Sequence, residues 1–237
     1  MPEKLSLDEF SRKKGNRKFA TVVCDLEKSS LLEIIDSHKT EEIIDVLKEQ
    51  PLSVRENVKE VSVDMWGGFP KVIREVFPLA LIVIDRFHVM KLVNKSLNKL
   101  RLSLDLKGLK NRCLLLKNGR DLTEEEKTAL VQLLQKSPCL SIAYELKEEF
   151  RDIYETSKTV KMGRRRFEKW LIIASCLFGS VTQTIFKHLE EICNYFISGT
   201  TSGIMEGLNN KIKLILRQSY GFKNFDLMRQ KLLACLS

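Results

Sequence analysis

The chain has few of the residues that bind zinc or form disulfide frameworks. Its 237 residues include six cysteines and three histidines, and no two cysteines form a Cys-x-x-Cys pair. This spacing argues against a structural zinc site within the chain. The N-terminus has no apolar core of a signal peptide, and no apolar run is long enough to span a bilayer. We therefore expect a cytoplasmic protein with reduced thiols and no membrane insertion.

The chain also has fewer acidic residues than basic ones. The chain has 40 Lys and Arg residues against 31 Asp and Glu, which gives a net charge of +9. This excess favours a polyanionic partner, with nucleic acid ahead of an acidic membrane surface. Charge alone does not separate these partners from a basic enzyme that binds no polyanion. A hydrophobic fraction of 43% is enough for a buried core, and the length suits one large domain or one domain with an insertion.

Five strand-like segments are present in the first 85 residues. They span residues 5–10, 19–24, 31–35, 58–64 and 80–85. Short polar turns separate the first three, which predicts an antiparallel meander. Helical patterns at 41–49 and 69–76 precede the last two, which predicts parallel crossovers. The expected class is therefore α/β, with a mixed five-stranded sheet flanked by helices.

From about residue 101 to 195 the pattern is helical and charged. Thr123, followed three residues later by Glu126, predicts the start of one of these helices. The stretch is too long for a loop in a compact domain, so we expect a separate α-helical subdomain. This divides the chain into a first core part at 1–100, an α-helical insertion at 101–197 and C-terminal core helices at 198–237.

Three acidic residues are candidate metal ligands. Asp8 lies within the first predicted strand, Asp64 ends the fourth, and Glu206 opens a late helix. If the three carboxylates converge, they could hold two divalent metal ions for phosphodiester chemistry. For each acid alone, a turn, a cap or a favourable helix-dipole position is the simpler alternative. Glu9 should point to the opposite face of the strand from Asp8 and is the weaker candidate.

Asp85 and His88 form a second candidate pair. They follow the fifth predicted strand at a strand-to-helix turn, where both side chains could lie at one edge of the sheet. His88 could orient a carboxylate, contact a phosphate or bind a metal ion. Alternatively, Asp85 caps the following helix and His88 is an ordinary first-turn residue.

Basic and amide side chains in two helical segments are candidate DNA contacts, because such groups bind phosphates and base edges. A solvated helix face is the alternative for each cluster. Trp170 could stack on an unpaired base or pack in a core. The candidates are Arg164, Arg165, Arg166, Trp170, Asn209, Asn210, Lys211, Lys213 and Arg217.

Several short motifs occur in a fixed order along the chain. They are Leu7-Asp-Glu-Phe10 with Lys14-Gly15, Val61-Ser-Val-Asp-Met-Trp66, Phe77-Pro78, Asp85-Arg-Phe-His-Val-Met-Lys-Leu92, Met205-Glu-Gly-Leu-Asn-Asn-Lys-Ile-Lys213 and Tyr220-Gly-Phe-Lys-Asn-Phe225. Together they resemble the catalytic domain of DDE transposases of the ISL-three family of bacterial insertion sequences. The resemblance extends from Asp8 to the C-terminal region and so covers nearly the whole chain.

The resemblance implies a ribonuclease H-like fold with an all-α insertion before the last catalytic helix. It implies that Asp8, Asp64 and Glu206 are the DDE triad and that Mg²⁺ or Mn²⁺ ions are the cofactors. Asp85 and His88 match the Asp-x-x-His element of the related Mutator-type transposases. Either Asp64 or Asp85 could be the second triad acid. We choose Asp64, because a ribonuclease H-like sheet presents this acid at the end of its fourth strand, beside the first.

The implied activity is DNA strand cleavage and strand transfer during transposition of an insertion sequence. The implied partners are transposon ends and target DNA at the bacterial nucleoid, with a homo-oligomer left open. Family members are longer, with an N-terminal zinc-binding segment and a helix-turn-helix region. Because the first catalytic strand begins close to Met1, we expect a separate catalytic domain or the product of a truncated element. A non-catalytic DNA-binding remnant and a nuclease of the same fold are the alternatives.

Overall fold

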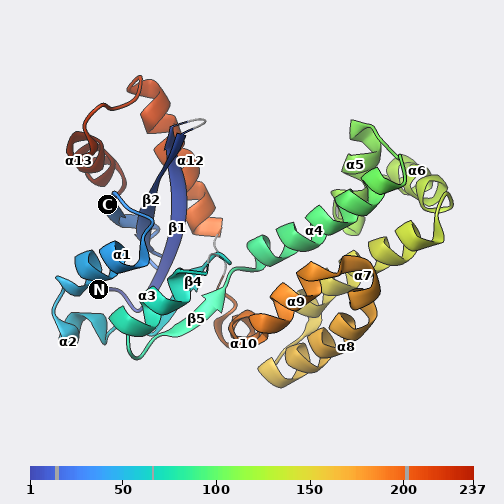
Figure 1. Cartoon of the computed structure of the whole chain (residues 1–237), viewed down its shortest axis with the longest axis horizontal. Coiled ribbons are helices and arrows are strands. Elements are labelled where there is room, and N and C mark those ends of the chain that lie inside the picture. Colours follow the sequence, from blue (N-terminus) through green and yellow to red (C-terminus); the bar gives the residue numbers. More distant parts are fainter. Residues whose placement is uncertain (14–15, 66, 201–202) are drawn as a thin grey trace. The chain divides into compact units, whose positions relative to one another are not determined.

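The chain forms two compact units, which we call the sheet unit and the helical unit (Figure 1). The structure is a computed structural model that describes residues 1–13, 16–65, 67–200 and 203–237. The sheet unit comprises Met1–Asp85 and Thr200–Ser237, and the helical unit comprises Arg86–Gly199. The motif residues Lys14, Gly15 and Trp66 lie outside the described residues.

A mixed five-stranded sheet forms the centre of the sheet unit. The strands pair in the order β3-β2-β1-β4-β5. The first three are antiparallel, and β4 is parallel to both β1 and β5. This confirms the predicted α/β class, with a meander followed by two parallel crossovers, and is consistent with a ribonuclease H-like fold. The strands are β1 (Lys4–Lys13), β2 (Asn16–Asp25), β3 (Ser30–Ile35), β4 (Glu60–Val63) and β5 (Leu81–Ile84).

Two C-terminal helices complete one hydrophobic core of the sheet unit. Helix α12 (Gly203–Gln218) contributes Met205 and Leu208, and α13 (Phe225–Leu236) contributes Met228. These side chains pack with Phe10 of β1 and with apolar residues of β2 and β3. The core therefore joins the first strands of the chain to its last helices.

The other helices of the sheet unit lie between strands in the sequence. They are α1 (Thr40–Lys48), the short α2 (Leu52–Arg55) and α3 (Phe69–Val76). Helices α1 and α3 pack against each other, and each buries one apolar side. The predicted bounds of α3 are confirmed, with Pro70 in its first turn, where the missing N–H costs no hydrogen bond.

The helical unit begins directly after β5. Its helices are α4 (Arg86–Ser103), α5 (Leu109–Leu116), α6 (Glu124–Leu134), α7 (Pro138–Thr156), α8 (Val160–Phe178), α9 (Ser180–Lys187), α10 (Leu189–Cys193) and α11 (Tyr195–Ser198). Helix α7 packs on both α4 and α8. Because α4 packs within this unit, the division lies at Asp85, earlier than the boundary expected near residue 100. Thr123 and Glu126 form the predicted capping box at the start of α6.

Two close contacts stabilise the helical unit. The Lys147 side chain is fully buried on α7 and donates hydrogen bonds to the backbone oxygens of Leu115 and Lys117, each at 3.0 Å. Burial lowers the pKa of Lys147 to about 8. Gly163 of α8 lies directly against the ring of Phe196, which leaves no space for a Cβ atom. Among the described residues, no helix is both long and apolar enough to cross a membrane.

Candidate metal site

Three aspartates are at one level of the sheet, at the point where β4 and β5 end. Leu7 of β1 pairs with Val63, the last residue of β4, and Val63 pairs with Ile84, the last residue of β5. The next residue along each of the three chain segments is Asp8, Asp64 and Asp85, respectively. Neighbouring strands are about 4.8 Å apart, so residues at the same level can bring their side chains together.

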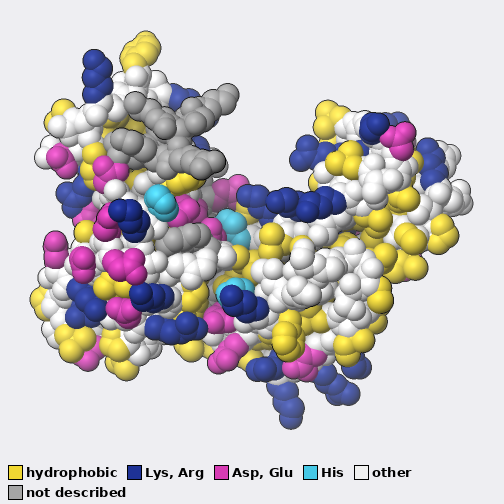
Figure 2. Space-filling view, in the orientation of Figure 1, with side chains coloured by type: hydrophobic (Ala, Val, Ile, Leu, Met, Phe, Trp, Pro, Cys, Tyr) yellow, Lys and Arg dark blue, Asp and Glu magenta, His cyan; other side chains and the backbone are white. Residues whose placement is uncertain are grey.

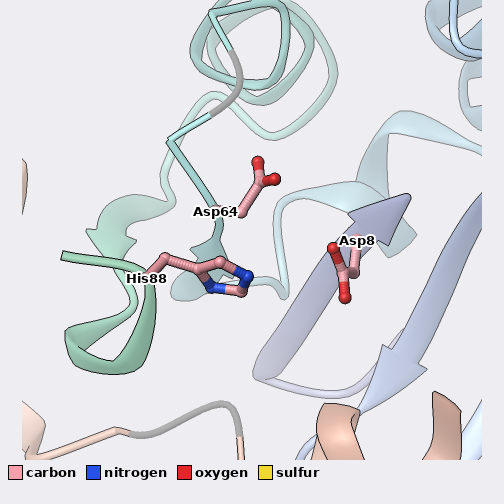
Figure 3. Close-up of side chains that lie close together, drawn as sticks. All are labelled: Asp8, Asp64 and His88. Carbon is pink, nitrogen blue, oxygen red and sulfur yellow. The ribbon is translucent and has the colours of Figure 1, made fainter. Parts of the chain in front are cut away.

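Asp8 and Asp64 are the two acids that the structure brings close together. Each offers a carboxylate oxygen, and these atoms are within 4.8 Å of one another. Both side chains are partly buried. Figure 3 shows Asp8 on β1 and Asp64 just beyond β4, drawn with His88. His88 is in the first turn of α4 and belongs to the helical unit, so its role as a ligand stays a prediction.

Asp85 and Glu206 have different surroundings from this pair. Asp85 is only 1% exposed, and its backbone N–H donates to the backbone oxygen of Val63 at 2.9 Å. Glu206 is exposed in the first turn of α12. Within the described chain, neither residue has a ligand atom within 4.8 Å of both Asp8 and Asp64. The structure thus brings two of the three predicted triad acids together.

Asn209 is the α12 side chain that reaches the aspartate pair. Its Nδ2 donates to Oδ2 of Asp8 at 2.7 Å, while the backbone N–H of Glu9 donates to Oδ1 at 2.8 Å. Both carboxylate oxygens of Asp8 are therefore held. Asn209 was expected to contact DNA, but it is only 8% exposed. This correction makes Asn209 a support for Asp8, through a bond that spans 201 residues of sequence.

Glu9 is a third carboxylate near the pair, although alternation along β1 ranked it below Asp8. Burial raises the pKa of Glu9, and the charge of Asp64 raises it further; His38 lowers it and Asp8 adds a smaller increase. Its Oε1 is buried and has no hydrogen-bond partner in the described part of the chain. Repulsion among neighbouring carboxylates favours the binding of a proton or a cation between them.

The predicted arginine cluster is on α8, where two of its members form ion pairs within the unit. Arg164 pairs with Glu168 at 3.2 Å, and Arg166 pairs with Asp152 at 2.6 Å. Arg165 is exposed and lines a basic pocket of about 490 Å³ on this helix. The charge of this cluster is therefore partly neutralised inside the protein.

Trp170 is in the core of the helical unit. It is 0% exposed, and its indole Nε1 donates to the backbone oxygen of Leu146 at 2.7 Å. A side chain in this position is not open to DNA, so the core-packing alternative holds and the stacking role is corrected. Four other candidates, all on α12, are exposed: Asn210, Lys211, Lys213 and Arg217.

Comparison with known proteins identifies a family whose model the chain matches. The family model DDE_Tnp_ISL3, described as a transposase, matches residues 5–232. The transposase for insertion sequence element IS1001 of Bordetella parapertussis is 27% identical over 247 residues, covering 98% of this chain and 60% of that protein. The transposase for element IS1557 of Mycobacterium tuberculosis is 25% identical over 259 residues, covering 93% of this chain and 57% of that protein.

The extent of these matches differs among the relatives. The chain spans about three fifths of the length of the two curated transposases. A Lactococcus lactis protein named ATP-dependent protease is 31% identical over 112 residues, covering 46% of this chain and 34% of that protein. The two transposase matches cover more than nine tenths of this chain, whereas the Lactococcus lactis match covers less than half of it.

Proposed function

The chain belongs to the DDE_Tnp_ISL3 transposase family of insertion sequences, and on that premise we propose that it cuts and joins DNA strands in transposition. Asp8, Asp64 and Glu206 are the proposed metal ligands. The observation that carries this proposal is the pair of aspartate carboxylates within 4.8 Å at the ends of neighbouring strands. The substrates are proposed to be the ends of the element and a target DNA.

The chemistry of the donors fits Mg²⁺ or Mn²⁺. Carboxylate oxygens are the hard ligands that these ions prefer, and Asp8 and Asp64 supply them from a rigid sheet. When bound, two such ions activate the attacking hydroxyl group and stabilise the leaving oxygen at phosphorus. Asn209 and the backbone of Glu9 hold Asp8 in one orientation, so this ligand is ordered before binding.

Glu206 is the proposed third ligand because of its position on α12. It precedes Asn209 by three residues, and residues three apart are neighbours on the same side of a helix. Since Asn209 bonds to Asp8, the carboxylate of Glu206 belongs to the adjacent turn, about 5 Å along the helix. This position on the same side of α12 as Asn209 supports Glu206 as the third ligand. Asp85 and His88 are proposed to support the site from the adjacent strand end.

DNA is the proposed partner of the exposed basic residues. Lys211, Lys213 and Arg217 follow Glu206 on α12 and are exposed, which supports a role for them in binding phosphates. Arg165 is the open member of the α8 cluster and is proposed as a further phosphate contact. We place this activity at the bacterial nucleoid, where the DNA of the element lies.

The test is a strand-cleavage and strand-transfer assay. Labelled element-end DNA is incubated with the protein and Mn²⁺, and the products are separated on a denaturing gel. Wild type and Asp45→Asn, a matched change at an exposed acid of α1, should give nicked and joined products. Asp8→Asn, Asp64→Asn and Glu206→Gln should each abolish both products.

The pattern of products separates the alternatives. Nicking without joining would assign the chain to nucleases of this fold, and a gel shift with neither product would make it a DNA-binding remnant. Normal cleavage by Glu206→Gln would remove Glu206 from the proposed ligand set and leave the aspartate pair in place.

A further inference from the structure

A groove lies wholly within the helical unit, between α4 and α5. Its volume is about 390 Å³, which is within the usual range for ligand-binding pockets. The groove is open rather than enclosed, so a ligand can lie along it. Its apolar lining comes from Phe87, Met90 and Leu116, and its polar lining from Lys91, Asn94, Lys95, Asn98 and Arg112.

The groove has an unusual excess of positive charge. The 18 residues of α4 include three exposed lysines, Lys91, Lys95 and Lys99, and no acidic residue. These lysines are four residues apart, so they form a row with a spacing of about 6 Å along the helix. Figure 2 shows dark blue Lys and Arg side chains gathered in the region of α4. Arg112 of α5 adds a further exposed cation.

These cations are not neutralised by the protein. Within the described ranges, Lys91, Lys95, Lys99 and Arg112 make no ion pair, in contrast to Arg86 at the start of α4, which pairs with Glu155 at 3.0 Å. Uncompensated cations in a row repel one another. An anionic ligand relieves that repulsion, and a strand of phosphates carries repeated charge along one direction.

Two further groups in the groove are suited to a base. The Oδ1 atom of Asn94 is buried without a hydrogen-bond partner among the described residues, so this amide has unused hydrogen-bonding capacity. Phe87 lines the same groove and is 51% exposed, so its ring is accessible to a ligand in the groove. An exposed ring beside amides and cations is the usual set of contacts for an unpaired base and its backbone.

We propose that the groove between α4 and α5 binds a single strand of DNA. The phosphates lie along Lys91, Lys95 and Arg112, and unpaired bases contact Phe87 and Asn94. The inference rests on the proposed function, because strand cleavage and transfer expose unpaired DNA that the protein must hold. It assigns a DNA-binding role to α4, distinct from the α8 cluster, whose arginines are partly neutralised by Asp152 and Glu168.

Fluorescence anisotropy with labelled oligothymidylate, in the presence of a chelator, tests the site without catalysis. The variant Lys91→Gln/Lys95→Gln/Arg112→Gln should weaken binding at least tenfold and reduce the salt slope by about two, since each single-strand phosphate contact contributes about 0.7. The matched control, Lys107→Gln/Lys127→Gln/Lys136→Gln, removes the same charge from exposed residues outside the groove and should bind within about twofold of wild type. Lys91→Arg/Lys95→Arg keeps the charge and should also retain binding.

Phe87→Ala tests the stacking contact separately. It should weaken binding of oligothymidylate about tenfold and leave binding of a duplex of equal length unchanged, because a paired base offers no free face. Equal losses in the groove triple variant and its matched control would overturn the proposal. So would equal losses for duplex and single strand with Phe87→Ala, or displacement of the DNA by a polyglutamate peptide at the same charge concentration.

The two proposals fail in different ways. The groove is lined by none of the proposed metal ligands, so the affinity of the groove variants and the cleavage by wild type are separate readouts. Absence of cleavage by wild type, with the groove variants still losing affinity, would refute the transposase activity and support the groove. Normal cleavage with unchanged affinity in the groove variants would refute the groove alone.

Discussion

Replacing Asp64 with Asn should stabilise the protein in the absence of metal and remove its stabilisation by Mn²⁺. The reason is that Asp8 and Asp64 are like charges whose oxygens lie within 4.8 Å. At that distance their repulsion is about 0.9 kcal/mol at the dielectric constant of water and about 3.5 kcal/mol at an effective value of 20. Both side chains are partly exposed, so the lower end applies and the gain is about 1 kcal/mol.

With Mn²⁺ bound, wild type should become more stable than Asp64→Asn. A ligand at 100 times its Kd stabilises the folded state by about 2.7 kcal/mol. For a chain of this size, 1 kcal/mol corresponds to about 2–4 °C in Tm. Wild type should therefore melt about 5–10 °C higher with Mn²⁺, whereas Asp64→Asn should melt about 2–4 °C above wild type in chelator and respond little to the metal.

Differential scanning calorimetry of the two proteins, with chelator and with Mn²⁺, measures both effects. Asp45→Asn is the matched control, because Asp45 is an exposed acid on α1, and it should follow wild type in each condition. A Mn²⁺ shift in Asp64→Asn as large as that of wild type would refute the metal assignment. An Asp64→Asn variant that is less stable than wild type in chelator would refute the repulsion.

Three further predictions concern other parts of the structure. Asn209→Ala should weaken Mn²⁺ binding at least tenfold by isothermal titration calorimetry, because it frees one metal ligand to rotate, whereas the exposed neighbour Asn210→Ala should not. Gly163→Ala should lower the free energy of unfolding by about 1–3 kcal/mol in urea, since the new methyl group meets an aromatic ring of α11; Gly207→Ala, with open space around it, should not be destabilising. The lowered pKa of Lys147, about 8 against 10.5 when unfolded, means that the unfolded state binds more protons between these values. From pH 8 to 10.5, the free energy of unfolding of wild type should thus rise by at most about 3 kcal/mol relative to that of Lys147→Met. Urea midpoints of the two proteins that change in parallel over this range would contradict the prediction.

The strands of the sheet could be predicted because their pattern is local. Alternating and β-branched residues mark β1, β2 and β4, and the antiparallel and parallel connections follow from the turns and helices between them. The same logic predicted that Asp8 and Asp64 would share one edge, because each is fixed by its place along a strand. Their close approach confirms that part of the prediction.

The surroundings of two side chains could not be predicted, because they depend on distant parts of the chain. Asn209 looked like a DNA contact among Asn and Lys neighbours, yet its partner Asp8 is 201 residues away in sequence. Trp170 follows a run of arginines, but its burial is decided by packing against Phe150 and Phe178. Local sequence shows what a side chain can bind and does not show which surface of a helix faces the core.

The core that joins β1–β3 to α12 and α13 also affects synthesis of the protein. Phe10 and its neighbours on the early strands are buried by residues that follow the 114-residue helical unit. At about 5–20 residues per second, the ribosome needs roughly 6–23 s to translate that unit. During this interval the apolar surface of the newly made sheet has no C-terminal cover and depends on chaperones or on slow collapse. Completion of the sheet unit is therefore coupled to translation of the whole chain, and a premature stop codon within the helical unit would leave the apolar surface of β1–β3 without α12 and α13.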